Sequence, residues 1–331
     1  MRTRAVFALL LVCSVATAAQ DSSVFRSNTN LVVVPVTVTD RSGRFVRDLS
    51  ADQFEISEDG APRRPTQFSA ECVPVSLGIL LDISGSMAQD PKARAADDAR
   101  WADTQRALEL LVTRLGTGDE AFFVVFNDKV SLAEPWTQDH AGILRAFDLL
   151  QPGGGTALVD AVKLIAPAFR LAQHQRKVLL LIADGNDTHL PSSVDIPTYA
   201  NTPEQQRRAT IGERQRVLRE LTIEGTKTAV RRSDAMLYAV GIGTRKGAPV
   251  DVAMLESLTL ESGGSVEPLR DPSEISAAVA RICDDLQSQY VLAFEPQHAD
   301  GKYHAITVKT KRNGLRVRAR SGYVATGNPN P

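Results

Sequence analysis

Hydrophobic and polar positions follow two different patterns along the chain. In the central part, short apolar runs alternate with longer stretches in which apolar residues recur every three or four positions. The short runs predict buried strands, at 75–82, 120–126, 177–183 and 235–242. The longer stretches predict amphipathic helices, at 92–115, 140–150, 157–173, 203–232, 252–262 and 272–289. Because such strands alternate with helices, we expect an α/β domain whose doubly wound, mostly parallel sheet is covered on both faces.

Both ends of the chain carry strand patterns without helices, at 31–39, 45–46 and 54–57 before the central part and at 290–294, 303–310 and 315–320 after it. Turn signals separate several of these strands, namely Asp59-Gly60, Asp300-Gly301 and Asn313-Gly314. The last three strands predict a meander, and Pro35 favours an edge position or a bulge for the first strand. Neither end is large enough to fold comfortably alone. We therefore expect the N- and C-terminal strands to pair into one small β-sandwich beside the α/β domain.

The first 18 residues have the features of a secretory signal peptide. Arg2 and Arg4 precede an apolar core at 5–15, and Ala16-Thr17-Ala18 is an A-x-A cleavage site. The core is shorter than the roughly 20 residues that span a bilayer, and no later segment is long and apolar enough to do so. A lipid anchor on Cys13 is less favoured, because bulky Val12 precedes it. The protein is therefore expected to be exported, in the periplasm or secreted.

The chain thus divides into a signal peptide (1–18), an N-terminal β segment (28–70), the α/β domain (73–288) and a C-terminal β segment (289–323). Its 331 residues are 43% hydrophobic and 23% charged, with a formal net charge of −1, which is typical of a soluble globular protein and gives no reason to expect nucleic-acid binding. Two cysteines remain after signal removal. Cys72 and Cys283 either pair in an oxidising compartment or stay free thiols, and the sequence leaves both alternatives open.

Oxygen-bearing side chains gather where predicted strands end. The strand at 75–82 ends in Asp82-x-Ser84-x-Ser86, and the strand at 177–183 runs directly into Asp184. A glycine-rich loop, Pro152-Gly-Gly-Gly-Thr156, lies between them in sequence. In a doubly wound sheet, ligands bind outside the carboxyl ends of the strands where the winding direction reverses. We therefore expect these side chains to meet at one edge of the sheet.

Two carboxylates and three hydroxyls suit a hard divalent cation whose shell is completed by water. Because the set contains no His or Cys, zinc is disfavoured and Mg²⁺ is the first choice, with Mn²⁺ or Ca²⁺ as alternatives. Few of the ligands are charged, so the ion keeps positive charge to attract an acidic group. Taken singly, Asp82 could be a helix cap, Ser84 or Ser86 a turn residue and Thr156 a helix cap.

The set Asp82-x-Ser84-x-Ser86, Thr156 and Asp184-Gly185 resembles the metal-ion-dependent adhesion site of von Willebrand factor type A domains, over roughly residues 73 to 288. The flanking segments, which include 34–40, 54–60 and the ending at Tyr323, resemble a bacterial, secreted "VWFA-related" family. The resemblance implies that the five residues hold the metal directly or through water and that a partner's acidic residue fills an open position. Gly155, Asp187 and His189 are the predicted partner contacts, although for His189 a plain loop-surface position is the first interpretation and partner contact the alternative.

The leading hypothesis is an exported binding or adhesion module, not an enzyme, which holds an acidic group of a protein partner through the cation. A metal-dependent hydrolase is the first alternative, although the cluster lacks an evident general base. A structural envelope protein whose metal site is not essential is the second alternative.

Overall fold

The computed structural model describes residues 31–71, 73–87, 99–190, 202–243 and 250–325. The expected signal peptide and Cys72 lie outside these residues, whereas Cys283 is buried on the last helix. The question of their pairing therefore stays open. No helix in the described part of the chain is long and apolar enough to cross a membrane.

A twisted sheet of six described strands forms the centre of the molecule, in the order β10-β9-β8-β5-β6-β7. The parallel strands are β5 (Val75–Asp82), β6 (Glu120–Phe126), β8 (Arg176–Ala183), β9 (Met236–Ile242) and β10 (Val266–Leu269), and β7 (Val130–Thr137) runs antiparallel to β6. Every residue of β5, β6 and β9 is buried. Burial of both faces explains why these strands are almost continuously apolar. The expected doubly wound α/β sheet is confirmed.

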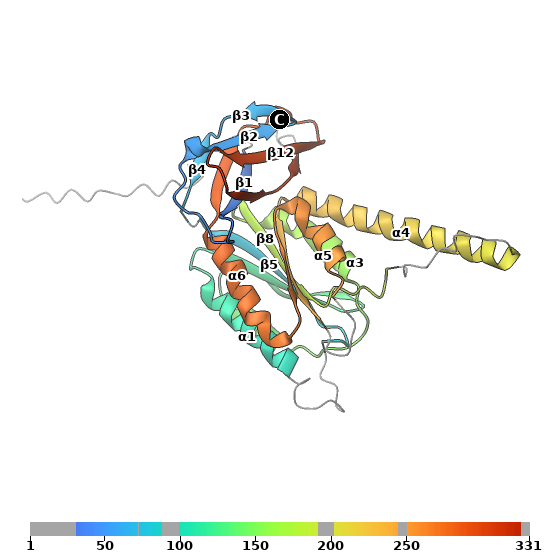
Figure 1. Cartoon of the computed structure of the whole chain (residues 1–331). Helices are drawn as coiled ribbons and strands as arrows, with labels where there is room; N and C mark the ends of the chain where they lie inside the picture. The colour runs from blue at the N-terminus through green and yellow to red at the C-terminus, as the bar shows by residue number, and fades with distance from the viewer. Residues whose placement is uncertain (1–30, 72, 88–98, 191–201, 244–249, 326–331) are drawn as a thin grey trace, which may run out of the picture.

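Helices cover both faces of this sheet (Figure 1). One face packs against α1 (Ala99–Arg114), α2 (Ala141–Phe147) and α6 (Ile275–Gln287), and the other against α3 (Leu158–Ile165), α4 (Pro203–Ser233) and α5 (Val252–Thr259). Successive side chains of β5 alternate between these two cores. Ile79 and Leu81 face the first core, and Leu80 faces the second. The predicted helix at 157–173 is an α-helix only to Ile165 and continues as a 3-10 helix at Ala166–Leu171, where Pro167 cannot donate to the α-helical ladder.

The terminal strands form two small sheets that share one apolar core, as expected (Figure 1). The first has the order β13-β1-β11-β4 and the second β14-β12-β2-β3. Their bounds are β1 Val32–Thr39, β2 Phe54–Glu58, β3 Ala61–Arg63, β4 Gln67–Ser69, β11 Tyr290–Phe294, β12 Tyr303–Thr310, β13 Arg316–Ala319 and β14 Gly322–Val324. N-terminal β1 pairs with C-terminal β11 and β13, and β2 pairs with β12. The two ends of the chain therefore depend on each other for a core.

Three details of the predicted β segments are wrong. The last strands do not form a meander, because β11 and β13 both pair with β1 while β12 lies in the other sheet. The segment at 45–46 forms a single bridge, from Phe45 to Thr39, and no returning strand. Pro35 lies in an inner strand, opposite Val291, without a bulge in this pairing. The β13 ladder begins only at Val36, so the missing N–H of Pro35 costs no hydrogen bond there.

Candidate metal centre

Asp82 is the last residue of β5, at the carboxyl edge of the central sheet. Its side chain is buried, and its Oδ1 accepts a hydrogen bond of 2.7 Å from the amide of Ser84. Among the described atoms, Oδ2 has no hydrogen-bond partner although it is buried. Burial, with a further contribution from the nearby charge of Asp184, raises the pKa of Asp82 to about 7. A buried carboxylate oxygen without a donor is a position that a cation would stabilise.

Ser84 and Ser86 place their hydroxyls side by side in the loop after β5. The two Oγ atoms lie 2.9 Å apart, and Ser84 is buried while Ser86 is exposed. A turn closed by a hydrogen bond from the amide of Met87 to the carbonyl oxygen of Ser84 holds this geometry. Arg100, at the start of α1, donates to the carbonyl oxygen of Ser86. Both hydroxyls are therefore held on a loop whose main chain is fixed.

The glycine-rich loop is bonded directly to the loop after β5. The amide of Gly153 donates to the carbonyl oxygen of Ile83 at 2.7 Å. The amide of Gly85 donates to the carbonyl oxygen of Gly154 at 2.9 Å. These two bonds align the loops main chain to main chain. They bring Thr156, which is buried just before α3, to the edge of the sheet where Asp82 lies.

Asp184 follows β8 directly and is buried. Its Oδ1 accepts a hydrogen bond of 3.0 Å from the amide of Asn186, which closes a tight turn through Gly185. Gly185 has φ +80°, a conformation that favours glycine. The structure thus places all five predicted metal ligands on three neighbouring loops at one edge of the sheet. Their ability to bind a metal stays a prediction.

Two residues that were not singled out from the sequence connect these loops. The hydroxyl of Thr188 accepts a hydrogen bond of 2.8 Å from the amide of Thr156 and donates to its carbonyl oxygen at 3.2 Å. Asp128, just after β6, accepts a hydrogen bond of 2.8 Å from the amide of Gly155. The sequence signal that could have identified Asp128 is its position, because it follows a buried strand at the same carboxyl edge of the sheet.

The three predicted partner contacts differ in how they are used within the fold. Asp187 accepts main-chain hydrogen bonds on both carboxylate oxygens, from Val159 at the start of α3 and from His189 and Leu190. Asp187 therefore holds the loop after β8 against the start of α3. The ring of His189 is partly exposed and lies 3.1 Å from Asp128. Gly155 donates its amide to the same carboxylate. Contact of any of the three with a partner stays a prediction.

The candidate donor set suits a hard cation although it is not a cluster of acids and histidines. Among the described residues, no group of three or more His, Cys, Asp or Glu side chains could hold a metal ion. Here only two of the five candidate ligands are carboxylates, and the other three are hydroxyls. Oxygen donors of this kind match Mg²⁺, Mn²⁺ or Ca²⁺, and the orphaned Oδ2 of Asp82 marks where positive charge is missing.

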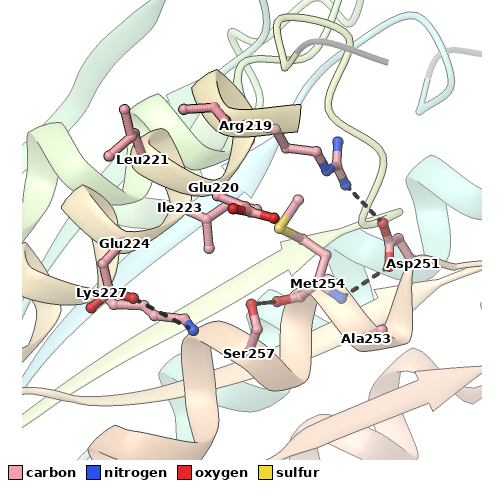
Figure 2. Close-up of a pocket in the computed structure, with 11 residues that line it drawn as sticks. Arg219, Glu220, Leu221, Ile223, Glu224, Lys227, Asp251, Ala253, Met254 and Ser257 are labelled. Atoms are coloured by element: carbon pink, nitrogen blue, oxygen red, sulfur yellow. Dashed lines mark hydrogen bonds and ion pairs between the residues drawn. The ribbon is translucent and has the colours of Figure 1, made fainter. Parts of the chain in front are cut away.

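A pocket lies between α4 and α5 (Figure 2). Arg219 pairs with Asp251 at 3.5 Å, and Lys227 pairs with Glu224 at 3.9 Å. Asp251 also caps α5 by accepting a hydrogen bond from the amide of Met254. The third acid of the pocket, Glu220, pairs with Arg216. Because each carboxylate of the pocket has a cationic partner, the pocket is no competing candidate for a cation.

Residues 77–186 match the family model described as von Willebrand factor type A domain. A comparison with curated proteins finds no match. Among solved structures, the conserved hypothetical protein BatB from Bacteroides thetaiotaomicron is 20% identical, with a TM-score of 0.45 over 64% of this chain and 97% of that one. A von Willebrand factor type A protein from Catenulispora acidiphila is 13% identical, with a TM-score of 0.47 over 92% and 76% of the two chains.

A third similar structure is proximal thread matrix protein 1 from the mussel byssus, described with a zinc-occupied MIDAS motif. It is 15% identical, with a TM-score of 0.45 over 69% of this chain and 49% of that one. At TM-scores below 0.5, none of these likenesses carries function to this chain.

Proposed function

Because the chain contains a von Willebrand factor type A domain, we propose that it is a binding module that holds an acidic group of a protein partner through a divalent cation. Asp82, Ser84, Ser86, Thr156 and Asp184 would hold the cation, directly or through water. When bound, the cation would supply the positive charge that attracts a carboxylate. The matched segment, 77–186, includes all five residues.

The observation that carries this proposal is the buried carboxylate of Asp82. Its Oδ2 has no donor among the described atoms, and Asp184 adds a second negative charge nearby. Two neighbouring buried carboxylates repel each other, and a cation between them would remove both that repulsion and the unpaired oxygen. The exposed hydroxyl of Ser86 supports access to the same place from solvent.

Mg²⁺ is the proposed ion, because zinc sites in proteins usually draw on nitrogen or sulfur ligands. The nearby imidazole, that of His189, is hydrogen-bonded to Asp128. Binding is proposed in preference to hydrolysis because the five candidate ligands include no evident general base. We further propose export into the periplasm or medium, on the basis of the signal-peptide features at 1–18 and the resemblance of the flanking strands to a secreted family.

Affinity capture tests this function. The full chain, Asp82→Ala and Asp184→Ala would each be used as bait for envelope and secreted proteins, with Mg²⁺ or with EDTA, and captured proteins identified by mass spectrometry. Asp139→Ala is the matched control, because Asp139 is an exposed acid paired with Arg145 away from the five residues. We expect partners that bind only with Mg²⁺ and only to the native chain and the control. Partners that stay bound to both site variants and in EDTA would contradict the proposal.

Hydrolysis is distinguished by a separate assay. Turnover of phosphoester or peptide substrates by the purified chain that requires metal and is abolished by Asp82→Ala would establish the enzymatic alternative. We expect no such turnover.

A further inference from the structure

We propose that Asp128 is a positioning residue for the candidate metal centre, which it serves by fixing the glycine-rich loop that presents Thr156. This inference rests on the proposed function. It assigns to the turn after β6 a role in ordering a site whose ligands come from other loops.

The contacts of Asp128 bridge three loops. Its Oδ2 accepts a hydrogen bond of 2.8 Å from the amide of Gly155, the residue before Thr156. Its Oδ1 lies 3.1 Å from Nε2 of His189, on the loop that also carries Asp184. Because Asp128 itself follows β6, one carboxylate connects the turn after β6, the glycine-rich loop and the loop after β8.

Two glycines of the loop, Gly154 and Gly155, lie so close to this carboxylate that a side chain would not fit. A Cβ on Gly154 would lie 2.4 Å from Oδ2 of Asp128, and a Cβ on Gly155 would lie 2.4 Å from Oδ1. Both distances are far below van der Waals contact, so a larger residue at either position would push the carboxylate away. The run of glycines therefore serves close approach to Asp128 as well as backbone freedom.

Asn127, the residue before Asp128, also holds the glycine-rich loop. Its side-chain amide donates to the carbonyl oxygen of Gly153 at 2.8 Å, and its main-chain carbonyl oxygen accepts a hydrogen bond of 2.9 Å from the amide of Ala157. The loop is thus held on both sides of Thr156, and Asp128 supplies the charged contact beside it.

Three variants separate positioning from a direct effect of charge. Asp128→Ala removes both contacts. Asp128→Asn keeps an oxygen for the amide of Gly155, and its NH₂ can donate to His189 when the imidazole proton is on Nδ1. A residue that positions by hydrogen bonding is therefore replaced well by Asn, whereas a residue that acts by charge or as a ligand is not. Asp139→Ala is the control for loss of an exposed, paired acid.

The experiment is a Mn²⁺ titration of each full-length variant, with free Mn²⁺ followed by electron paramagnetic resonance well below the unfolding temperature. We expect Asp128→Ala to bind Mn²⁺ about 10–100-fold more weakly than the native chain, as is usual for loss of a group that orients metal ligands. Asp128→Asn should stay within about threefold of the native affinity, since both contacts survive, and Asp139→Ala should be unchanged. Asp82→Ala should abolish binding.

The outcomes distinguish this inference from the proposed function. Native affinity in Asp128→Ala would overturn the positioning role and leave the metal centre standing. Equal weakening in Asp128→Asn and Asp128→Ala would overturn positioning in favour of charge. A native chain that binds no Mn²⁺ would overturn the proposed function and this inference together. Amide hydrogen exchange gives a readout without metal: Gly155 should be protected in the native chain and lose protection in Asp128→Ala, and an unprotected native Gly155 would contradict the contact.

Discussion

The amide of Gly85 donates a hydrogen bond of 2.9 Å to the carbonyl oxygen of Gly154. This contact joins the loop after the first central strand to the glycine-rich loop, which lies far along the chain. A Cβ on Gly85 would come within 3.3 Å of the same carbonyl oxygen, so the close approach favours glycine there. Main-chain hydrogen bonds therefore connect the loop that carries Ser84 and Ser86 to the loop that carries Thr156.

The glycine-rich loop should tolerate a methyl group poorly. Gly43 and Gly154 have similar positive φ values, +83° and +88°, but a Cβ on Gly43 would meet open space. Gly43→Ala should therefore cost about 1 kcal/mol of unfolding free energy from backbone strain alone, and Gly154→Ala about 3 kcal/mol because steric overlap with Asp128 adds to the strain. Urea denaturation measures both. Equal losses in the two variants would show that Asp128 does not crowd Gly154.

Stability of the metal-free protein should fall as pH rises towards neutrality. Burial raises the pKa of Asp82 from 3.8 to about 7. The folded state therefore binds more protons than the unfolded state between these values, so this group's contribution is fully present below pH 3.8 and is lost as pH rises through about 7. The loss is on the order of 4 kcal/mol.

Thermal denaturation in EDTA measures this loss, with Asp82→Asn as the variant that removes it. Added Mg²⁺ should stabilise the native chain more at pH 8 than at pH 5, because protons compete for the same carboxylate. A Mg²⁺ effect that is equal at the two pH values would contradict the assignment of Asp82.

His304, in the β-sandwich, should stay protonated to a higher pH than an ordinary histidine. His304 is buried, with Nε2 3.0 Å from Asp300 and Nδ1 2.7 Å from Asp59. Hydrogen bonds to Asp300 and Asp59 raise its pKa above 6.5, since only the cation can donate from both nitrogens. Its contribution to stability is thus fully present below pH 6.5 and lost as pH rises through the raised pKa. An NMR titration should give a midpoint above 6.5 that falls in Asp300→Asn; a native midpoint at or below 6.5 would refute this.

The contact between the sandwich and the α/β domain should depend on Asp285. This buried carboxylate of α6 accepts hydrogen bonds from Thr37 of β1 at 2.6 Å and from Tyr238 of β9 at 3.0 Å, and it pairs with Arg318 of β13. Asp285→Ala should cost about 3 kcal/mol, because it leaves a partly buried guanidinium without its partner.

The neighbouring residue provides the control for Asp285. Asp284 is about half exposed, and its carboxylate pairs with Arg114. Asp284→Ala should change the free energy of unfolding by less than about 1 kcal/mol. Urea denaturation compares the two variants, and equal losses would mean that the buried network does not hold the two parts together.

The sequence predicted the central fold, and it predicted that the five candidate ligands lie at one edge of the sheet, for a physical reason. Strands buried on both faces must be continuously apolar, so the run that ends at Asp82 and the run before Asp184 stood out, and a polar residue at the end of such a strand is conspicuous. By contrast, β7 and β10 were missed. Both are short or half-buried, and both contain a proline, Pro135 and Pro268, which weakens the strand pattern.

The rest depended on contacts between distant segments. Nothing local to Asp128 or Thr188 shows that they reach the glycine-rich loop, because each is a polar loop residue whose partner is about 30 residues away. The pairing order of the terminal strands was hidden for the same reason. Turn signals such as Asp300-Gly301 mark where strands end, but they do not say that the next strand enters a different sheet.

Calorimetric titration of the chain with Mg²⁺ shows whether the five candidate ligands bind a cation. We expect one Mg²⁺ bound per chain at pH 8 and no binding by Asp82→Ala or Asp184→Ala, with Asp139→Ala unchanged. Binding of Mg²⁺ by Asp82→Ala with native affinity, or a folded native chain that binds none, would contradict this expectation.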